Sequence, residues 1–434
     1  MVITALRSVR KRATGSMTAV TKLIRQPFQE NMMNNKYVIT LLSAIIGIGL
    51  MFLGTKLLHT GTSASSIKVG FVYIGDTGTA YTNNYVRSQL ELEDALGDKV
   101  QTIAKYNIPE DNDICQEAME DLVKQGCSLI FTTSFGFQEI TKKMAEKYPK
   151  VQFCQATGVN ANEAPILSNY HNFMGTIYEG RYLSGIAAGL KLKELIEQKK
   201  ITPDQAKIGY VAAFPFAEVI SGYTAFFLGI KSIVNEAKMT VIYTNTWSNH
   251  VIEKKYAERL INDGAIIIGQ HSDTTGPAIA CEEASTKSGK RVYHVGYNQS
   301  MTDVAPTTSL ISSRINWTPY IVGAAQAVLK GKRIENFLHS RLSGNDTAFG
   351  FDKGWVEIIG LNKLICPKET QEELNKYEKL LKNKDLQVFK ADFTGENPFD
   401  PTDIWNLKNP FPENKNSSAP QFHYVLRDVI TIIE

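Results

Sequence analysis

The chain has 434 residues, enough for two or three ordinary domains, and its 43% hydrophobic and 21% charged residues are typical of a globular protein with a substantial core. The formal net charge is +3, but residues 1–66 carry eight Lys or Arg and one acid, a net of +7, which leaves −4 for the remainder. A mildly acidic main body argues against nucleic-acid binding, which depends on clustered Lys and Arg.

The N-terminal region combines a basic leader with an apolar run. Residues 37–54, YVITLLSAIIGIGLMFLG, would span about 27 Å as a helix, close to one bilayer crossing. Positive charge before this run and polar residues after it predict that the chain is extracytoplasmic from about residue 60 onward. We expect a basic cytoplasmic leader at 1–36 and a signal peptide or transmembrane anchor at 37–58, with a buried core helix as the alternative. The protein would then lie at the extracytoplasmic face of the cell membrane, anchored or secreted.

The sequence after residue 66 contains an internal repeat. KVGFV at 68–72 recurs as KIGYV at 207–211, an offset of 139 residues. Three further strand-like runs recur in the same order: VQTIAKYN at 100–107 as MTVIYTNT at 239–246, LVKQGCSLIFTTS at 122–134 as LINDGAIIIGQHS at 260–272, and VQFCQATG at 151–158 as RVYHVGYN at 291–298. Four strand-like runs at nearly one spacing predict two similar lobes.

Amphipathic helical stretches separate these runs, at 81–96, 138–148 and 221–236. Strands that alternate with helices are typical of βαβ units, which build parallel sheets with helices on both faces. The segment 175–200 is typical of a helix that joins the lobes. We expect the following division: lobe 1 at 67–175, lobe 2 at 176–305, a return to lobe 1 at 306–345, and a C-terminal extension at 346–434.

The strand ends predict a binding cleft between the lobes. In open α/β sheets ligands bind beyond the carboxyl ends of the strands, and clefts between domains are preferred small-molecule sites. For the aromatic residues the alternative is packing in a lobe core, and for the Asp and Asn residues after the first strand it is capping of a turn or helix. We expect the ligand to contact Asp76, Tyr81, Asn83, Asn84, Ser134, Phe135, Gly158, Phe214, Glu218, Trp247, Asp273, Asn298 and Trp317.

The chemistry of these loops favours a flat, uncharged ligand. Aromatic residues alternate with neutral hydrogen-bonding groups and a few acids, and Arg314 is the only Lys or Arg in the loops at the strand ends. A phosphorylated ligand would require a basic group or an open helix N-terminus. A heteroaromatic ring instead requires π-faces above and below it and hydrogen bonds at its edge. Nucleobases and nucleosides fit this description, and sugars fit it less closely.

Several long motifs in one order resemble the basic membrane protein (BMP) family, the substrate-binding proteins of ABC importers that include purine nucleoside receptors. The matching stretches are KVGFVYIGD, LIFTTSFGF, NFMGTIYEGRYLSGIAAG, KIGYVAAFPFAEVISGYTAFFLGI and VGYNQS. The resemblance covers residues 67–335. It implies an α/β, type I periplasmic-binding-protein fold, in which two doubly wound, Rossmann-like lobes joined by a hinge close around a purine.

The same resemblance implies that the closed protein delivers its ligand to an ABC permease and ATPase. It also identifies differences within the family. The branch associated with adenine usually has Trp and His at the positions of Thr79 and Asn83, and nucleoside receptors have Asp at the position of Asn298. Exchanging Asp for Asn replaces an acceptor by a group that both donates and accepts, which changes the preferred contact to base or ribose.

Motifs of catalysis and metal binding are not present in the sequence. It lacks the nucleophile elbow, the HExxH motif, the P-loop and the EF-hand loop. Its five Cys and seven His are scattered, and His271 is the one His in the predicted cleft, where a hydrogen-bonding role is favoured over catalysis. We expect no enzyme activity, no metal and no cofactor. The alternatives to import are a membrane-anchored sensor of the same fold and a receptor for a sugar or another small polar ligand.

Overall fold

The computed structural model describes residues 63–433, so the predicted leader at 1–36 and the apolar run at 37–58 lie outside the described residues. Within residues 63–433 no helix has the length and apolar character needed to cross a membrane. The described residues belong to a single unit of the chain, Gly61–Glu434.

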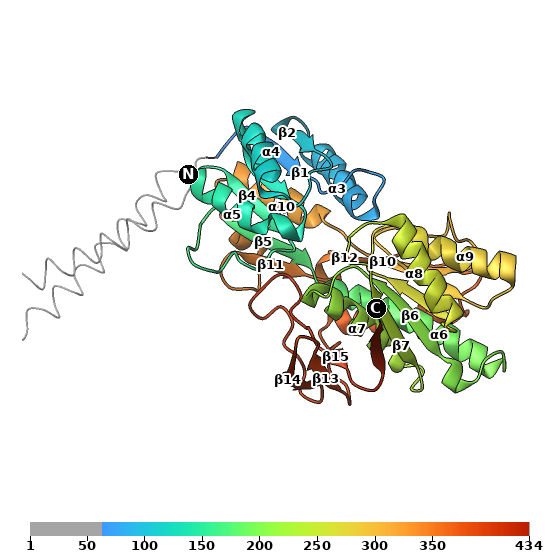
Figure 1. The fold of residues 1–434 in the computed structure, drawn as a ribbon. Coiled ribbons are helices and arrows are strands. Elements are labelled where there is room, and N and C mark those ends of the chain that lie inside the picture. Colours follow the sequence, from blue (N-terminus) through green and yellow to red (C-terminus); the bar gives the residue numbers. More distant parts are fainter. Residues whose placement is uncertain (1–62, 434) are drawn as a thin grey trace, which may run out of the picture. The chain divides into compact units, whose positions relative to one another are not determined.

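The first lobe is built on a six-stranded parallel sheet (Figure 1). Its strands are short apolar runs because helices cover both faces, as is typical of parallel sheets. In sheet order they are β11 (Asp346–Phe349), β5 (Tyr170–Gly175), β4 (Gln152–Ala156), β3 (Cys127–Thr132), β1 (Ile67–Val72) and β2 (Val100–Lys105).

The second lobe has a seven-stranded sheet in which only the edge pairing of β12 with β10 is antiparallel. In sheet order the strands are β12 (Val356–Ile359), β10 (Ser309–Ile315), β9 (Tyr293–Tyr297), β8 (Ile267–Gln270), β6 (Lys207–Ala212), β7 (Lys238–Tyr243) and β16 (Ile430–Ile433).

The sequence repeat corresponds to a repeat in sheet order. Strands β4, β3, β1 and β2 follow one another in the first sheet as β9, β8, β6 and β7 do in the second. Gly126 and Gly264 occupy the same place before β3 and β8, and both have positive φ, 88° and 92°. Such a backbone conformation favours Gly, which explains why the repeat preserves this residue at the turn from helix to strand.

Helices cover both faces of each sheet. On one face of the first sheet, the buried residues of α3 and α10 belong to the same core as Val69 and Phe71 of β1. On the other face, the buried residues of α4 and α5 pack with Val72 and Ile130. On the second sheet, α6, α7 and α12 belong to one core and α8 and α9 to another. The helices are α3 (Ala80–Leu96), α4 (Asn112–Lys124), α5 (Gln138–Lys147), α6 (Ile177–Glu197), α7 (Ala217–Lys231), α8 (His250–Asn262), α9 (Gly276–Ser288), α10 (Thr318–Leu329), α11 (Ile334–Leu338) and α12 (Thr370–Lys382).

The chain passes between the lobes three times, at residues 175–177, 315–318 and 349–356, which we call the crossing segments. Backbone hydrogen bonds join them: Thr176 donates to the carbonyl of Phe349 (2.9 Å), and Asn316 donates to the carbonyl of Trp355 (2.8 Å). The segment expected to return to lobe 1, residues 306–345, is therefore divided. Its strand β10 lies in the second sheet, whereas its helix α10 packs against α3 of the first lobe.

The C-terminal part of the chain forms structure of its own beside the second lobe. Strands β13 (Thr394–Asn397), β14 (Asp400–Asn406) and β15 (Val425–Leu426) make a small antiparallel sheet near α7, drawn in dark red in Figure 1. The final strand β16 then pairs in parallel with β7 and extends the second sheet. The stretch 407–424 connects β14 to β15 without helix or strand, held by buried side chains such as Phe422.

We predict that the contact between α6 and α7 tolerates no added methyl group. A Cβ at Gly185 would collide with the carbonyl oxygen of Phe226, and one at Gly229 would collide with that of Tyr182. Because both obstacles are backbone atoms, Gly185→Ala or Gly229→Ala should lower the free energy of unfolding by about 1–3 kcal/mol, measured by urea denaturation. Lys193→Ala, on the exposed side of α6, is the control and should change it by less than about 0.5 kcal/mol. Equal effects of all three substitutions would contradict this account of the helix contact.

Candidate functional site

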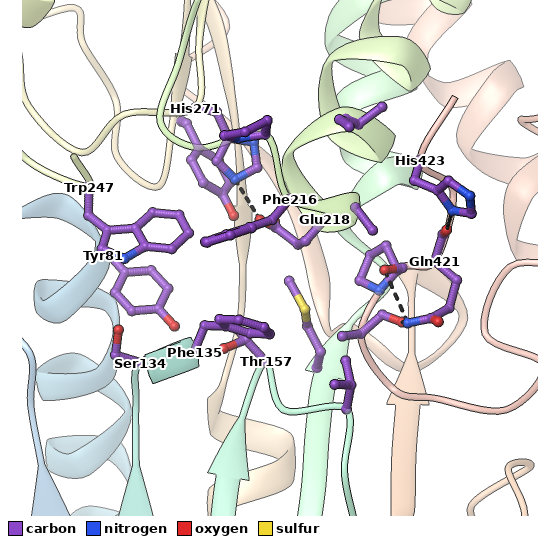
Figure 2. A pocket seen from close by; sticks show the side chains of 18 of the residues that line it. Tyr81, Ser134, Phe135, Thr157, Phe216, Glu218, Trp247, His271, Gln421 and His423 are labelled. Atoms are coloured by element: carbon purple, nitrogen blue, oxygen red, sulfur yellow. Dashed lines mark hydrogen bonds and ion pairs between the residues drawn. The ribbon is translucent and has the colours of Figure 1, made fainter. Parts of the chain in front are cut away.

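A cavity of about 550 Å³ lies at the carboxyl ends of the strands of both sheets (Figure 2). Its volume is in the range of small-molecule sites, and its lining mixes aromatic, aliphatic and polar side chains. The lining residues are Ile74, Tyr81, Ser134, Phe135, Thr157, Val159, Glu163, Met174, Pro215, Phe216, Ala217, Glu218, Ile220, Trp247, His271, Asp273, Tyr297, Asn397, Phe399, Ala419, Pro420, Gln421 and His423.

Two aromatic rings, one from each lobe, meet in the middle of the cavity. Phe135 begins the short helix that follows β3, and Phe216 precedes α7; their ring centroids are 5.2 Å apart with an interplanar angle of 34°. Phe214 stacks on Phe216 and meets the edge of Trp247, with centroid distances of 5.2 and 4.8 Å. Figure 2 shows Phe216 and Phe135 facing each other, with Tyr81 and Trp247 to one side. The site therefore offers aromatic faces from both lobes.

A hydrogen-bonded pair, Glu218 and the buried His271, lies beside these rings. Glu218, in the first turn of α7, places its Oε2 2.9 Å from Nε2 of His271, which follows β8 and is only 3% exposed. Burial lowers the pKa of His271, and the adjacent carboxylate of Glu218 partly offsets this effect. The positive end of the α7 dipole favours a carboxylate at this position. The pair holds the Glu218 carboxylate at the cavity wall with one oxygen already engaged.

A hydrogen-bonded chain of three side chains connects the lobes behind the cavity. Asn84 of α3 donates to Oδ1 of Asn298 (3.2 Å), and Asn298 donates to Oδ1 of Asp273 (3.3 Å), which lines the cavity. Burial raises the pKa of Asp273 well above its usual range, and the nearby carboxylate of Glu253 raises it further. Asp273 therefore presents a carboxyl group that favours its protonated form and can donate a hydrogen bond as well as accept one.

A buried cation lies behind the wall and makes no direct contribution to the lining. The guanidinium of Arg181, on α6, lies 3.5 Å from the ring centroid of Tyr297 and donates from Nη1 to the carbonyl of Gln270 (2.7 Å). Tyr297 separates this charge from the cavity, and neither Lys nor Arg is among the described residues that line it. Strand-end position could not indicate Arg181, because it lies inside a helix.

Six of the thirteen predicted ligand-binding residues line the cavity: Tyr81, Ser134, Phe135, Glu218, Trp247 and Asp273. Three more contact these residues without lining it: Asn84 and Asn298 through the chain to Asp273, and Phe214 through the rings of Phe216 and Trp247.

The other four lie elsewhere. Asp76 is exposed and accepts from the backbone nitrogen of Gly78 (2.8 Å), and Asn83 is exposed on α3. Trp317 is fully buried and stacks on Tyr85 with a centroid distance of 4.5 Å, which is the lobe-core alternative.

Gly158 serves close packing. A side chain at this position would collide with Asn172, whereas its neighbours Thr157 and Val159 line the cavity. Strand-end position alone does not indicate which residue of a loop points into the cavity.

The largest omission is the C-terminal extension. Asn397, from the end of β13, and Phe399, just after it, line the cavity, as do Ala419, Pro420, Gln421 and His423 from the stretch between β14 and β15. In Figure 2, Gln421 and His423 lie on the side of the cavity opposite Tyr81 and Trp247. The Pro and Asn content of this region indicated only an irregular wrap, because no periodicity relates it to the strand ends of the lobes.

A model of the family described as ABC transporter substrate-binding protein PnrA-like (Bmp) matches residues 73–392. The chain belongs to this family. It is 34% identical over 266 residues to the purine-binding protein of Brucella abortus (strain 2308), an alignment that covers 61% of this chain and 69% of that protein. It is 29% identical over 274 residues to TsgA13 of Haloferax volcanii, whose name provisionally assigns glucose binding in an ABC transporter; 62% of this chain and 63% of that one are covered.

The fold is also that of solved ABC substrate-binding proteins, as predicted. A solute-binding protein of an ABC transporter system from Aeropyrum pernix K1 superposes with a TM-score of 0.60 at 14% identity, covering 74% of this chain and 92% of that one. Membership of the Bmp family identifies the chain as an extracytoplasmic substrate-binding protein that takes a small molecule to an ABC permease, and not as an enzyme. The family match ends at residue 392, just before β13.

Because the pKa of Asp273 is raised, replacing this residue with one that cannot ionise should stabilise the folded protein by an amount that depends on pH. The folded state keeps a proton that the unfolded state releases, so the stability due to the protonated form is present below the unfolded pKa of about 3.9 and is lost as pH rises through the folded pKa. Asp273→Asn, which cannot ionise, should therefore raise the free energy of unfolding at pH 8 by about 1 kcal/mol or more, and the gain should vanish near pH 4.

Urea denaturation at a series of pH values measures this effect. Asp392→Asn is the matched control, because the side chain of Asp392 is 82% exposed and should give no pH-dependent gain. A gain for Asp273→Asn that is the same at pH 4 and pH 8 would show that the carboxyl group is not desolvated in the folded state.

Proposed function

We propose that this substrate-binding protein captures a purine nucleobase or nucleoside by closure of its two lobes and delivers it to a membrane permease. The observation that carries the proposal is the facing pair Phe135 and Phe216, one ring from each lobe, beside neutral and acidic hydrogen-bonding groups. The purine-binding relative supports the same ligand class.

The ring pair indicates how closure and binding are coupled. The rings of Phe135 and Phe216 are in direct contact, with their centroids 5.2 Å apart. A planar ligand between them requires about 7 Å, twice the optimal contact distance of about 3.5 Å between carbon atoms. Entry therefore requires the lobes to separate slightly, after which the base replaces the contact between the rings with two stacking contacts. A ligand that bridges both lobes in this way stabilises the closed state through its differential affinity for it.

The edge groups suit a base that both donates and accepts hydrogen bonds. Glu218 offers acceptors, whereas Asp273, with its raised pKa, offers an acceptor and a donor. The hydroxyl of Tyr81 already donates to the carbonyl of Thr133 (2.6 Å), so it supplies mainly its ring. A phosphate would be disfavoured, because two carboxyl groups line the same wall and no Lys or Arg lines the cavity within residues 63–433.

Removing either central ring should weaken binding of a base. We expect the wild-type protein to bind at least one of adenine, guanine, adenosine, guanosine and inosine with a micromolar or lower Kd by isothermal titration. Phe135→Ala or Phe216→Ala should raise that Kd by about 10- to 100-fold, since base–aromatic stacking contributes about 1–3 kcal/mol. Tyr106→Ala is the control, because its exposed ring lies outside the cavity.

Binding of glucose or ribose in place of every base and nucleoside would contradict the purine proposal and support the sugar alternative, for which the Haloferax relative is named. Binding of a purine without delivery to a permease would instead support the sensor alternative.

We propose in addition that residues 37–58 anchor the protein in the membrane, on the strength of the apolar run and the basic leader before it. The full chain should then remain with membranes washed in alkaline carbonate, whereas a chain lacking residues 1–58 should be recovered in the soluble fraction. Release of a mature protein that begins near residue 65 would show that the segment is a cleaved signal peptide.

A further inference from the structure

The cavity has a wall that the family match does not include. Phe399, Gln421 and His423 line it, yet all three follow residue 392, where the match ends. Figure 2 shows Gln421 and His423 on the far side of the Phe135–Phe216 pair from Trp247. The cavity thus continues past the aromatic pair toward the C-terminal segment.

Hydrogen bonds to both lobes hold this wall in place. The buried carboxylate of Glu413 accepts from the backbone nitrogens of Gln421 (2.6 Å) and Phe422 (2.9 Å) and from the hydroxyl of Ser221 on α7 (2.9 Å). The backbone nitrogen of Ser418 donates to Oδ1 of Asp346 on β11 (2.8 Å). Gln421 and His423 are therefore held in register with both halves of the site.

A second carboxylate orients the side chains of the wall. Asp403 accepts hydrogen bonds from Nδ2 of Asn397 (3.1 Å) and from the hydroxyl of Tyr424 (2.9 Å). It also pairs with Nε2 of His423 (3.1 Å). The other ring nitrogen of His423 lies 2.7 Å from the carbonyl of Gln421. Because both of its nitrogens are engaged, His423 offers the cavity mainly the faces of its ring. The amide of Asn397 is held in place by its hydrogen bond to Asp403.

Gln421 and Phe399 are the groups of this wall left available to a ligand. The Gln421 amide nitrogen makes only long contacts, 3.3 and 3.4 Å, to the carbonyls of Ala419 and Pro420 among the described residues. Phe399 is 71% exposed, although it is aromatic and lines the cavity. An amide that can donate and accept and an uncovered apolar face, both lining the same cavity, match a ring with hydroxyl groups at its edge and C–H bonds on its face.

From this arrangement we infer that the C-terminal wall is a subsite for the pentose of a nucleoside, recognised by Gln421 and covered by Phe399. The inference rests on the proposed function, because the base would occupy the aromatic pair and place its sugar toward this wall. A phosphate would not suit the wall, whose lining from residues 393–433 contains no Lys or Arg and has the carboxylate of Asp403 behind it. The protein would accordingly prefer a nucleoside to both the free base and the nucleotide.

Isothermal titration of the full chain against adenine, adenosine, AMP, guanine and guanosine tests this inference. The wild-type protein should bind the nucleoside about 10-fold or more tightly than its base, and AMP more weakly than adenosine. Gln421→Ala and Phe399→Ala should each weaken nucleoside binding by about 5- to 10-fold and weaken binding of the base much less. Neither side chain supports the fold through a short hydrogen bond or burial, so both variants should fold.

Ile404→Ala is the matched control, since Ile404 is an exposed apolar residue on β14 that does not line the cavity. It should leave every affinity unchanged. If base and nucleoside bind equally well to the wild type, or if the Gln421 and Phe399 variants weaken both ligands alike, the pentose subsite is wrong and the purine function stands. If no base or nucleoside binds at all, the proposed function fails, and this inference fails with it.

Discussion

The crossing segments are the constraint on which the rest of the site depends. They bring the carboxyl ends of two parallel sheets to face each other, and they lie so close that a Cβ at Gly175 would approach Ile315 Cγ2 at 2.8 Å and the carbonyl of Trp355 at 3.0 Å. Each lobe has its own sheet, and the chain passes from one sheet to the other only in these few residues, so they are where a change of conformation between the lobes would be concentrated. The cavity, with walls from both lobes, can therefore open and close while each wall keeps its geometry.

The C-terminal segment modifies this simple hinge. Through Ser418 it is bonded to β11 of the first lobe, and through Glu413 to α7 of the second, while β16 extends the second sheet. Burial raises the pKa of both carboxyl groups involved, that of Asp346 to about 6. Since the segment is joined far more extensively to the second lobe, opening would break its bond to Asp346 first. The wall would then move with the second lobe and return to the ligand on closure.

The repeat made the architecture predictable, whereas the site was predictable only in part. An offset of 139 residues and the paired glycines before β3 and β8 indicate four strands of each sheet, because each apolar run must be buried on two faces. Strand ends then indicate loops but not side-chain directions: Asp76 turned to cap its own loop, and Trp317 turned into the core. The wall containing Gln421 depends on contacts with residues some 200 positions away, such as that between Ser221 and Glu413, which no local pattern encodes.

Two kinds of contact across the cleft would respond differently to a ligand. The Phe135–Phe216 contact occupies space that a base needs, so binding must replace it. The chain from Asn84 through Asn298 to Asp273 lies behind the wall and can persist with the ligand bound. Its hydrogen bonds of 3.2 and 3.3 Å are long, so they favour closure weakly on their own. A receptor must remain able to open, and weak closure without ligand, strengthened by stacking when a base enters, meets that requirement.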